Sequence, residues 1–253
     1  MSKYYSTHGQ DRWIIERVFP EKRHGWFVDS GAGPDGIKGS NTYALESQFG
    51  WTGLLVEAIE QQSALIRKNR SATVEQCCLN DTRGEVEFVI HEWPGLSSMP
   101  QHLSEPDLVD ARFDREQFRK VRIPAAPLWE LLRHHNAPHV IEYLSLDIEG
   151  AEWIALKDFP FGEFRFLAMT IERNSKDYDK LRAKLRREGY RLVGVRGPDD
   201  FYVHESVGYP MSAKEKVNTQ LRSLWNTIYY REPLLTARRG ARWARNRLRS
   251  RQN

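Results

Sequence analysis

Short runs of apolar residues alternate with helix-like stretches from about residue 26 to residue 205. The runs are rich in Val, Leu, Ile, Phe and Tyr, which is typical of strands that are buried on both faces of a sheet. Strands that alternate with helices predict an α/β fold with a mostly parallel sheet. The predicted strands are residues 26–28, 54–56, 74–78, 143–146, 166–171, 190–195 and 201–203.

The stretches between these runs carry apolar residues at helical spacing. Ser40 is placed to cap a helix that contains Ala44, Leu45 and Phe49, and Pro127 suits the first turn of another. Further helices are predicted over residues 61–70, 150–156 and 178–188, the last ending at Gly189. The turn residues 197–199 between the last two runs predict a closing antiparallel hairpin.

Four segments follow from this pattern. Residues 1–25 form an N-terminal segment that we expect over the functional site, and residues 26–210 form the main domain. Within it, residues 92–126 contain four prolines and weak periodicity, which predicts a loop or lid that meets the substrate. Residues 211–253 contain a predicted helix, with Val217, Leu221 and Leu224 at helical spacing, and then a basic tail.

The net charge of +4 comes from that tail. Residues 236–253 hold seven arginines and no carboxylate, so the rest of the chain has 31 Lys and Arg against 34 Asp and Glu. The slightly acidic body gives no reason to expect nucleic acid as a partner. The tail predicts peripheral contact with anionic surfaces such as the inner face of a membrane.

The cysteines and the hydropathy pattern place the chain in the cytoplasm by expectation. Cys77 and Cys78 are adjacent and point to opposite sides of an extended chain, which disfavours a disulfide or a shared metal between them. We see neither a signal-peptide pattern at the N-terminus nor an apolar stretch long enough to span a bilayer.

Four apolar runs stop at an acidic residue. The carboxylates are Asp29, Glu57, Asp147 and Glu172. Ligands of open parallel sheets bind beyond the carboxyl ends of the strands, so these side chains are expected to converge on one crevice. Acids also favour such turns simply because they cap the following helix, and that reading holds for each one taken alone.

The glycine-rich segment after the first run matches G-x-G-x-x-G, with glycines at 31, 33 and 36. Two features disfavour a dinucleotide. Residues 37–39 separate the last glycine from the Ser40 cap, and Asp29 would repel a diphosphate but suits an ammonium or sulfonium group. A cationic cofactor such as S-adenosylmethionine fits better, and Glu57 is placed for the ribose hydroxyls of either cofactor.

Five segments of the chain form a pattern when taken in order: residues 5–11, 27–32 with 35–36, 40–42, 53–57 and 144–152. Together they resemble the FkbM-type methyltransferases, and the likeness covers most of residues 4–205. That resemblance implies a class I methyltransferase fold, Rossmann-like, with a seven-stranded sheet, and an S-adenosylmethionine-dependent enzyme. Gly33-Pro34 departs from the polar residue common in the family.

The resemblance also implies roles for individual residues. Asp29 with the loop after it would hold the methionine end of the cofactor, Glu57 the ribose, and Asn80 with Asp81 the adenine edge. Ser97-Ser98 resembles a serine pair found before the acceptor region. The expected cofactor-binding residues are Asp29, Gly31, Ala32, Gly33, Glu57, Ala58, Asn80 and Asp147.

Methyl transfer to a hydroxyl needs a group that removes its proton. Asp147, Glu149 and His8 are the candidates for this catalytic role. Alternatively, Asp147, Glu172 and Asn174 bind a divalent cation such as Mg²⁺, which orients the acceptor and lowers its pKa. A surface role for His8, and a helix-dipole role for Glu149, remain equally open.

The predicted function is O-methylation of a sugar, a glycan or a polyketide-type small molecule. The alternatives are a nucleic-acid or other N-methyltransferase, an NAD-dependent oxidoreductase and a non-catalytic cofactor-binding module. Residues 147–150 lack the aromatic platform that base methylation needs, which disfavours the nucleic-acid alternative. The pattern does not identify the acceptor or the oligomeric state.

Overall fold

A computed structural model describes residues 2–91, 97–102, 118–173, 175–211, 213, 215–217 and 219–221. The chain divides into two compact units, Met1–Pro210 and Met211–Asn253. Of the second unit, only a few residues between 211 and 221 are described, and they include helical positions such as 215–217. The arginine-rich tail and Asn174 lie outside the described residues.

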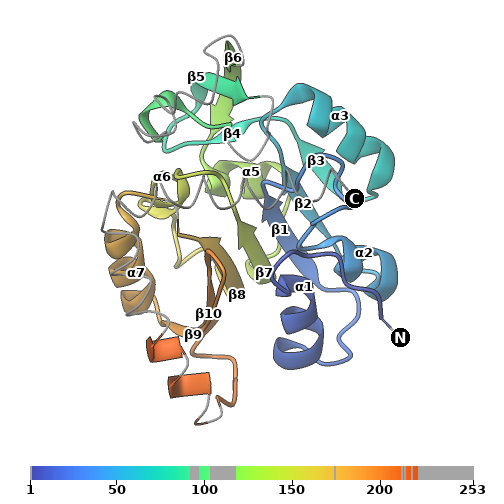
Figure 1. Ribbon diagram of the computed structural model, residues 1–253, viewed down its shortest axis with the longest axis vertical. Coiled ribbons are helices and arrows are strands. Elements are labelled where there is room, and N and C mark those ends of the chain that lie inside the picture. Colours follow the sequence, from blue (N-terminus) through green and yellow to red (C-terminus); the bar gives the residue numbers. More distant parts are fainter. Residues whose placement is uncertain are drawn as a thin grey trace, which may run out of the picture. The chain divides into compact units, whose positions relative to one another are not determined.

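A seven-stranded sheet forms the centre of the first unit, in the order β3-β2-β1-β7-β8-β10-β9 (Figure 1). Five neighbouring strands are parallel, and β10 runs antiparallel to both β8 and β9. This is the predicted α/β, Rossmann-like arrangement with its closing hairpin. The strands are Trp26–Ser30 (β1), Thr52–Val56 (β2), Thr73–Glu75 (β3), Val140–Leu146 (β7), Arg165–Glu172 (β8), Tyr190–Arg196 (β9) and Asp199–His204 (β10).

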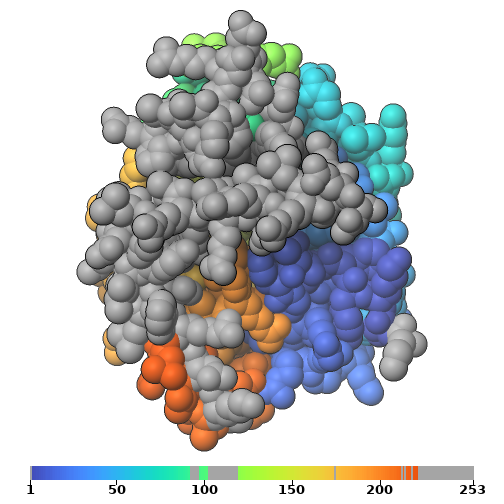
Figure 2. Space-filling model, in the orientation of Figure 1, coloured from blue at the N-terminus to red at the C-terminus, as the bar shows by residue number. Residues whose placement is uncertain are grey.

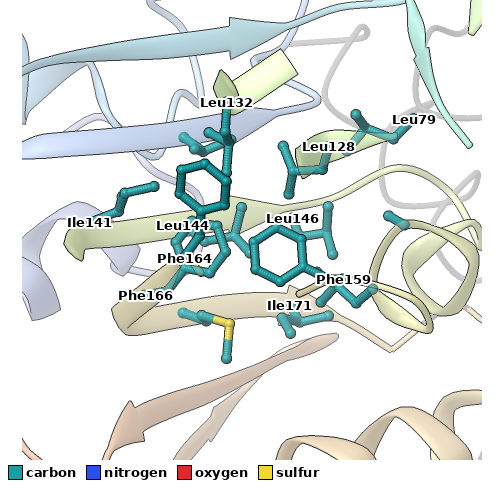
Figure 3. Packing of buried hydrophobic residues seen from close by; sticks show 14 of the residues in the cluster. Leu79, Leu128, Leu132, Ile141, Leu144, Leu146, Phe159, Phe164, Phe166 and Ile171 are labelled. Carbon is teal, nitrogen blue, oxygen red and sulfur yellow. The ribbon is translucent and has the colours of Figure 1, made fainter. Parts of the chain in front are cut away.

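Helices cover both faces of this sheet. Alternate residues of β7 show this, because Leu144 and Leu146 pack among the apolar residues of α5, α6 and α7, whereas Tyr143 points to the other face and bonds Thr170 of β8. Figure 3 shows Leu128 and Leu132 of α5 directed toward Leu144 and Leu146. The helices are Gln10–Trp13 (α1), Tyr43–Phe49 (α2), Glu60–Asn69 (α3), Leu128–His134 (α5), Glu152–Leu156 (α6) and Tyr178–Arg187 (α7).

Helices α2 and α5 begin within three residues of Ser40 and Pro127, the residues predicted to start them. The Ser40 hydroxyl accepts hydrogen bonds from the backbone N–H groups of Thr42 and Tyr43, at 3.2 and 3.1 Å, just before α2. Pro127 lies at the N-cap of α5. The two hydrogen bonds to Ser40 satisfy backbone N–H groups that the first turn of α2 leaves without partners.

Two sequence predictions about strands are wrong. Residues 74–78 do not form one strand: β3 ends at Glu75, and Cys78–Leu79 (β4) belongs to a second sheet with the order β4-β6-β5. In addition, part of the predicted loop at 92–126 is strand Phe118–Ala126 (β6), which pairs with Gly84–His91 (β5). Most of the remainder of that segment lies outside the described residues.

The small sheet forms because its two long strands alternate. Val86 and Phe88 lie opposite Ile123 and Val121, whereas Glu87 on the other face forms an ion pair with Lys120. The apolar face packs in a small core with Cys78, Met99 and Ala151. In Figure 1 this sheet lies at the top, beyond α5 and α6.

The N-terminal segment packs against the closing hairpin. The Trp13 ring meets the ring of Phe201 edge-on at 4.9 Å between centroids, and its indole N–H donates to the Tyr209 hydroxyl at 3.2 Å. Figure 2 shows the dark-blue N-terminal residues beside the orange residues of the hairpin. This packing brings His8 to the same side of the molecule as the end of β8.

Cys77 and Cys78 are both free and buried. They lie in different apolar clusters, Cys77 in the main core and Cys78 under the small sheet, so their side chains do point apart. Among the helices described, none is long and apolar enough to cross a membrane.

Candidate functional site

The candidate site lies at the carboxyl ends of β1 and β7, where the strand order reverses. Successive strands lead away from this point on both sides, and ligands of open α/β sheets bind in the crevice that results. The backbones meet closely here: the Asp147 N–H donates to the Ser30 carbonyl at 3.1 Å, and the Gly31 N–H donates to the Val56 carbonyl at 3.1 Å.

Gly31 is required by this close approach. Its φ is +83°, and a Cβ atom at this position would lie 1.9 Å from the Asp147 carbonyl oxygen. Gly33, with φ of +81°, continues the left-handed path, and Ala32 between them is buried. The Asp35 carboxylate then accepts hydrogen bonds from the backbone N–H groups of Ile37 and Lys38, at 2.9 and 2.8 Å. The loop after β1 is therefore held in a defined shape.

Asp29 is buried within β1, directly before this loop. Its Oδ2 accepts a hydrogen bond from the Thr42 hydroxyl at 2.6 Å, and its Oδ1 makes no hydrogen bond to any described residue. Burial raises the pKa of Asp29, against the Thr42 hydrogen bond and the positive charge of Arg70. An acceptor oxygen buried without a donor is the kind of group that an ammonium could satisfy.

Glu57 follows β2 and is also buried. Its Oε1 accepts the Ile59 N–H at 2.8 Å. Burial raises the pKa of Glu57 to about 7, although hydrogen bonds from the Ile59 and Ala58 backbone oppose the rise. The Ala58 N–H therefore helps to hold the Glu57 carboxylate. Glu57 also lies close enough to Asp29 for the charge of Asp29 to raise its pKa.

Asn80 lies further along, after β4. Its backbone N–H donates to the Ala126 carbonyl at 3.1 Å, and its side-chain amide reaches Thr82 at 3.4 Å. The adjacent Asp81 forms an ion pair with Lys157 at 2.5 Å. The predicted role of Asn80 at the adenine edge stays a prediction.

Three carboxylates gather on the β7–β8 side. Oxygens of Asp147, Glu149 and Glu172 all lie within 4.8 Å of one another. Burial, and the neighbouring charges of Asp199 and Asp29, raise the pKa of Asp147 to about 6. Burial and the charges of Asp147 and Glu149 raise the pKa of Glu172 well above its ordinary value.

Glu152 holds the turn that carries Asp147 and Glu149. Its Oε1 accepts the N–H groups of Gly150 and Ile148, at 3.1 and 3.3 Å, and burial raises its pKa to about 7. Glu149 adopts a φ of +52°, which is strained for a residue with a side chain. The Ser98 hydroxyl donates to the Glu149 carbonyl at 2.8 Å, so one residue of the serine pair lies against this turn.

His8 reaches the same region from the N-terminal segment. Its Nδ1 lies 3.0 Å from Asp199 Oδ2, which also accepts from the Gln10 side chain at 3.0 Å. Asp199 is opposite Glu172 in the β10–β8 ladder, so the two side chains lie on one face. The Asp199 hydrogen bond is the main cause of the raised pKa of His8, and the charge of Asp147 adds to it.

Three residues of this network escaped the sequence reasoning. Arg70 is a buried guanidinium that bonds the glycine loop and Thr42, and Asp199 orients His8. Thr42 lies in a segment that carries the family resemblance, which is the one signal that could have drawn attention to it. The sequence pattern places Arg70 at the end of a helix and Asp199 in a turn, and these positions predict surface roles.

The model of the methyltransferase FkbM domain family matches residues 29–192 of this chain. The match begins at Asp29 and includes Glu57. It also includes the three carboxylates Asp147, Glu149 and Glu172. A search of curated proteins found no matching relative.

Proposed function

The chain belongs to the FkbM methyltransferase family, and from this premise we propose that it is an S-adenosylmethionine-dependent O-methyltransferase. The proposed acceptor is a hydroxyl of a sugar, a glycan or a polyketide-type small molecule. The observation that carries the proposal is that β1, β2, β7 and β8 each carry a carboxylate at or just after their carboxyl ends, which suits a cationic methyl donor. These carboxylates are Asp29, Glu57, Asp147 and Glu172.

The donor would lie across the glycine loop. The fit rests on Asp29, whose Oδ1 is buried without a hydrogen bond to the described residues. Asp29 would accept from the donor's ammonium, and Glu57 from its ribose hydroxyls. When bound, the sulfonium supplies an electrophilic methyl group. Seven carboxyl groups near this edge would oppose a diphosphate: Asp29, Glu57, Asp147, Glu149, Glu152, Glu172 and Asp199.

Asp147 and His8 are the groups proposed to take the acceptor's proton. A carboxyl with a pKa of about 6 is a stronger base than an ordinary aspartate and is still largely ionised at neutral pH. His8 is oriented by Asp199, in the way that a carboxylate orients a catalytic imidazole. Glu149 is close enough to Asp147 to hold an acceptor hydroxyl.

A divalent cation is a second way to use the same carboxylates. Asp147, Glu149 and Glu172 offer hard oxygen ligands within 4.8 Å of one another, a donor set that suits Mg²⁺. Asn174 of the predicted ligand set lies outside the described residues. Such an ion would lower the pKa of the acceptor hydroxyl, and its charge would favour the ionised form of all three carboxyl groups.

Donor binding is tested by calorimetry with S-adenosylhomocysteine and NAD side by side. We expect micromolar binding of the first and none of the second. Asp29→Asn should weaken S-adenosylhomocysteine binding at least tenfold, because it removes the charge that faces the ammonium. Asp35→Asn is a matched control, since the asparagine Oδ1 can still accept from the Ile37 and Lys38 N–H groups and keep the shape of the loop. Binding of NAD alone would overturn the proposal.

The acceptor side is tested with Asp147→Asn. We expect turnover to fall by about a hundredfold or more with little change in S-adenosylhomocysteine affinity, because general-base catalysis contributes roughly 10²–10⁴-fold. Incubation with the donor and a polar metabolite or glycan pool should add one methyl group to one component. Donor binding without any methylated product would favour a non-catalytic module, and a methylated amine would favour N-methylation.

A further inference from the structure

Arg70 connects the loop after β1 with helix α2 through one buried guanidinium. Its side chain is fully buried. Nε donates to Glu46 Oε2 at 2.7 Å, Nη1 to the Gly36 carbonyl at 2.9 Å and to Ser40 Oγ at 3.2 Å, and Nη2 to Thr42 Oγ1 at 2.9 Å. Four of the five N–H groups of the guanidinium are therefore committed, and its orientation is fixed.

The direction of the next hydrogen bond follows from Arg70. A guanidinium only donates, so the Thr42 oxygen accepts from it, and the single Thr42 proton is free to point elsewhere. That proton goes to Asp29 Oδ2, 2.6 Å away. Arg70 thereby makes Thr42 a donor to Asp29 and supplies a positive charge behind it.

Asp29 is left with one satisfied and one free oxygen. Oδ2 is held by Thr42, whereas Oδ1 is buried and makes no hydrogen bond to a described residue by distance and angle. The Ser145 and Ser40 hydroxyls both lie close enough to the carboxyl to lower its pKa. Ser145 in turn accepts from the Asn41 side chain at 2.9 Å. The surroundings of Asp29 thus orient the carboxylate and leave one lone-pair site open.

We propose that Arg70 is a positioning residue for the methyl donor. Arg70 acts through Thr42, which orients Asp29 so that the free oxygen of Asp29 accepts the donor's ammonium. This inference rests on the proposed function. It adds that recognition of the amino-acid half of the donor depends on a residue that touches no part of the donor.

The affinities for two ligands distinguish a role of Arg70 in positioning the donor from a purely structural role. S-adenosylhomocysteine carries the ammonium, and 5′-methylthioadenosine has the same adenosine and thioether without the amino-acid group. Thr42→Val keeps the shape of the side chain but removes both hydrogen bonds. We expect it to weaken S-adenosylhomocysteine binding about tenfold or more, with 5′-methylthioadenosine binding unchanged within twofold.

Thr42→Ser restores the hydroxyl and should recover most of the lost affinity. Ser47→Ala is the control, since it removes an α2 hydroxyl that bonds only the Tyr43 carbonyl. Circular dichroism checks the fold of each variant. If Thr42→Val does not fold, Arg70→Lys is tested with the same two ligands, because lysine keeps the charge but cannot make the forked contacts.

Unchanged S-adenosylhomocysteine affinity in the folded variant would overturn the proposal. An equal loss for both ligands would overturn it as well, because it would mean that the network only supports the pocket. Failure of the wild-type protein to bind either ligand is a different result: it would reject the proposed function itself, and the role of Arg70 with it.

Discussion

At the scale of single residues, the loops after β1 and β7 can touch because Gly31 has no side chain. Gly31→Ala would place a methyl group 1.9 Å from the Asp147 carbonyl oxygen in addition to the cost of its left-handed φ. Since neither backbone can retreat without breaking the bond between Asp147 and Ser30, we expect this variant to lose more than about 3 kcal/mol of stability or fail to fold. Urea unfolding measures the loss.

Gly33→Ala shows how much of the loss in Gly31→Ala comes from the left-handed φ and how much from the close contact with Asp147. Gly33 has nearly the same φ, but an added Cβ would lie 3.6 Å from the Lys38 carbonyl oxygen, an ordinary contact. The expected cost is then only that of the left-handed conformation, roughly 1–2 kcal/mol. Equal losses for the two variants would show that the close approach to Asp147 is not what requires Gly31.

At the scale of elements, β7 links the core to the site. Leu144 is fully buried in the main core, and we expect Leu144→Ala to cost about 2–5 kcal/mol, the range for a buried leucine. Val140 at the start of the same strand is 48% exposed, so Val140→Ala should change the free energy of unfolding by less than about 0.5 kcal/mol. Similar losses in urea titrations would contradict the central position of β7.

The elements also show where sequence reasoning succeeded. Strands β1, β2, β7 and β8 could be predicted because burial on both faces makes them continuous apolar runs. The apolar and charged residues of β5 and β6 alternate, which is itself a strand pattern, but Pro124 and the weak periodicity of residues 92–126 disfavour a strand in β6. The structure accommodates Pro124 because β4 pairs with β6 only at Ala125 and Ala126.

The same distinction applies to the site. Asp147 and Glu172 could be predicted as neighbours because parallel strands end at one edge, and Leu146 pairs with Ile171 just before them. Arg70 acts from outside that edge, and Asp199 reaches it from the start of the antiparallel strand β10. Their contacts depend on how α3 and the N-terminal segment pack, which no local pattern in the sequence records.

At the scale of the whole molecule, the buried carboxylates make stability depend on pH. Burial raises the pKa of Glu57 and of Glu152 to about 7 and that of Asp147 to about 6, above their values in an unfolded chain. The folded state therefore binds more protons between pH 4 and 7 than the unfolded state does. The stability that these groups contribute is present below pH 4 and is lost as the pH rises through 6 to 7.

His8 acts in the same direction because its pKa is raised, whereas the lowered pKa of His204 opposes it. We expect the melting temperature of the ligand-free protein to fall between pH 5 and pH 8. Glu152→Gln keeps an acceptor for the Gly150 and Ile148 N–H groups but cannot ionise. It should raise the melting temperature at pH 8 and change little at pH 5.

Glu85→Gln on the exposed face of β5 is the matched control and should leave the pH profile as it is. S-adenosylhomocysteine should recover part of the stability lost at pH 8, because its ammonium offsets the charge that deprotonation creates. A flat pH profile in the wild-type protein would mean that these carboxyl groups keep ordinary pKa values, and the electrostatic reason for a cationic donor at this edge would then be lost.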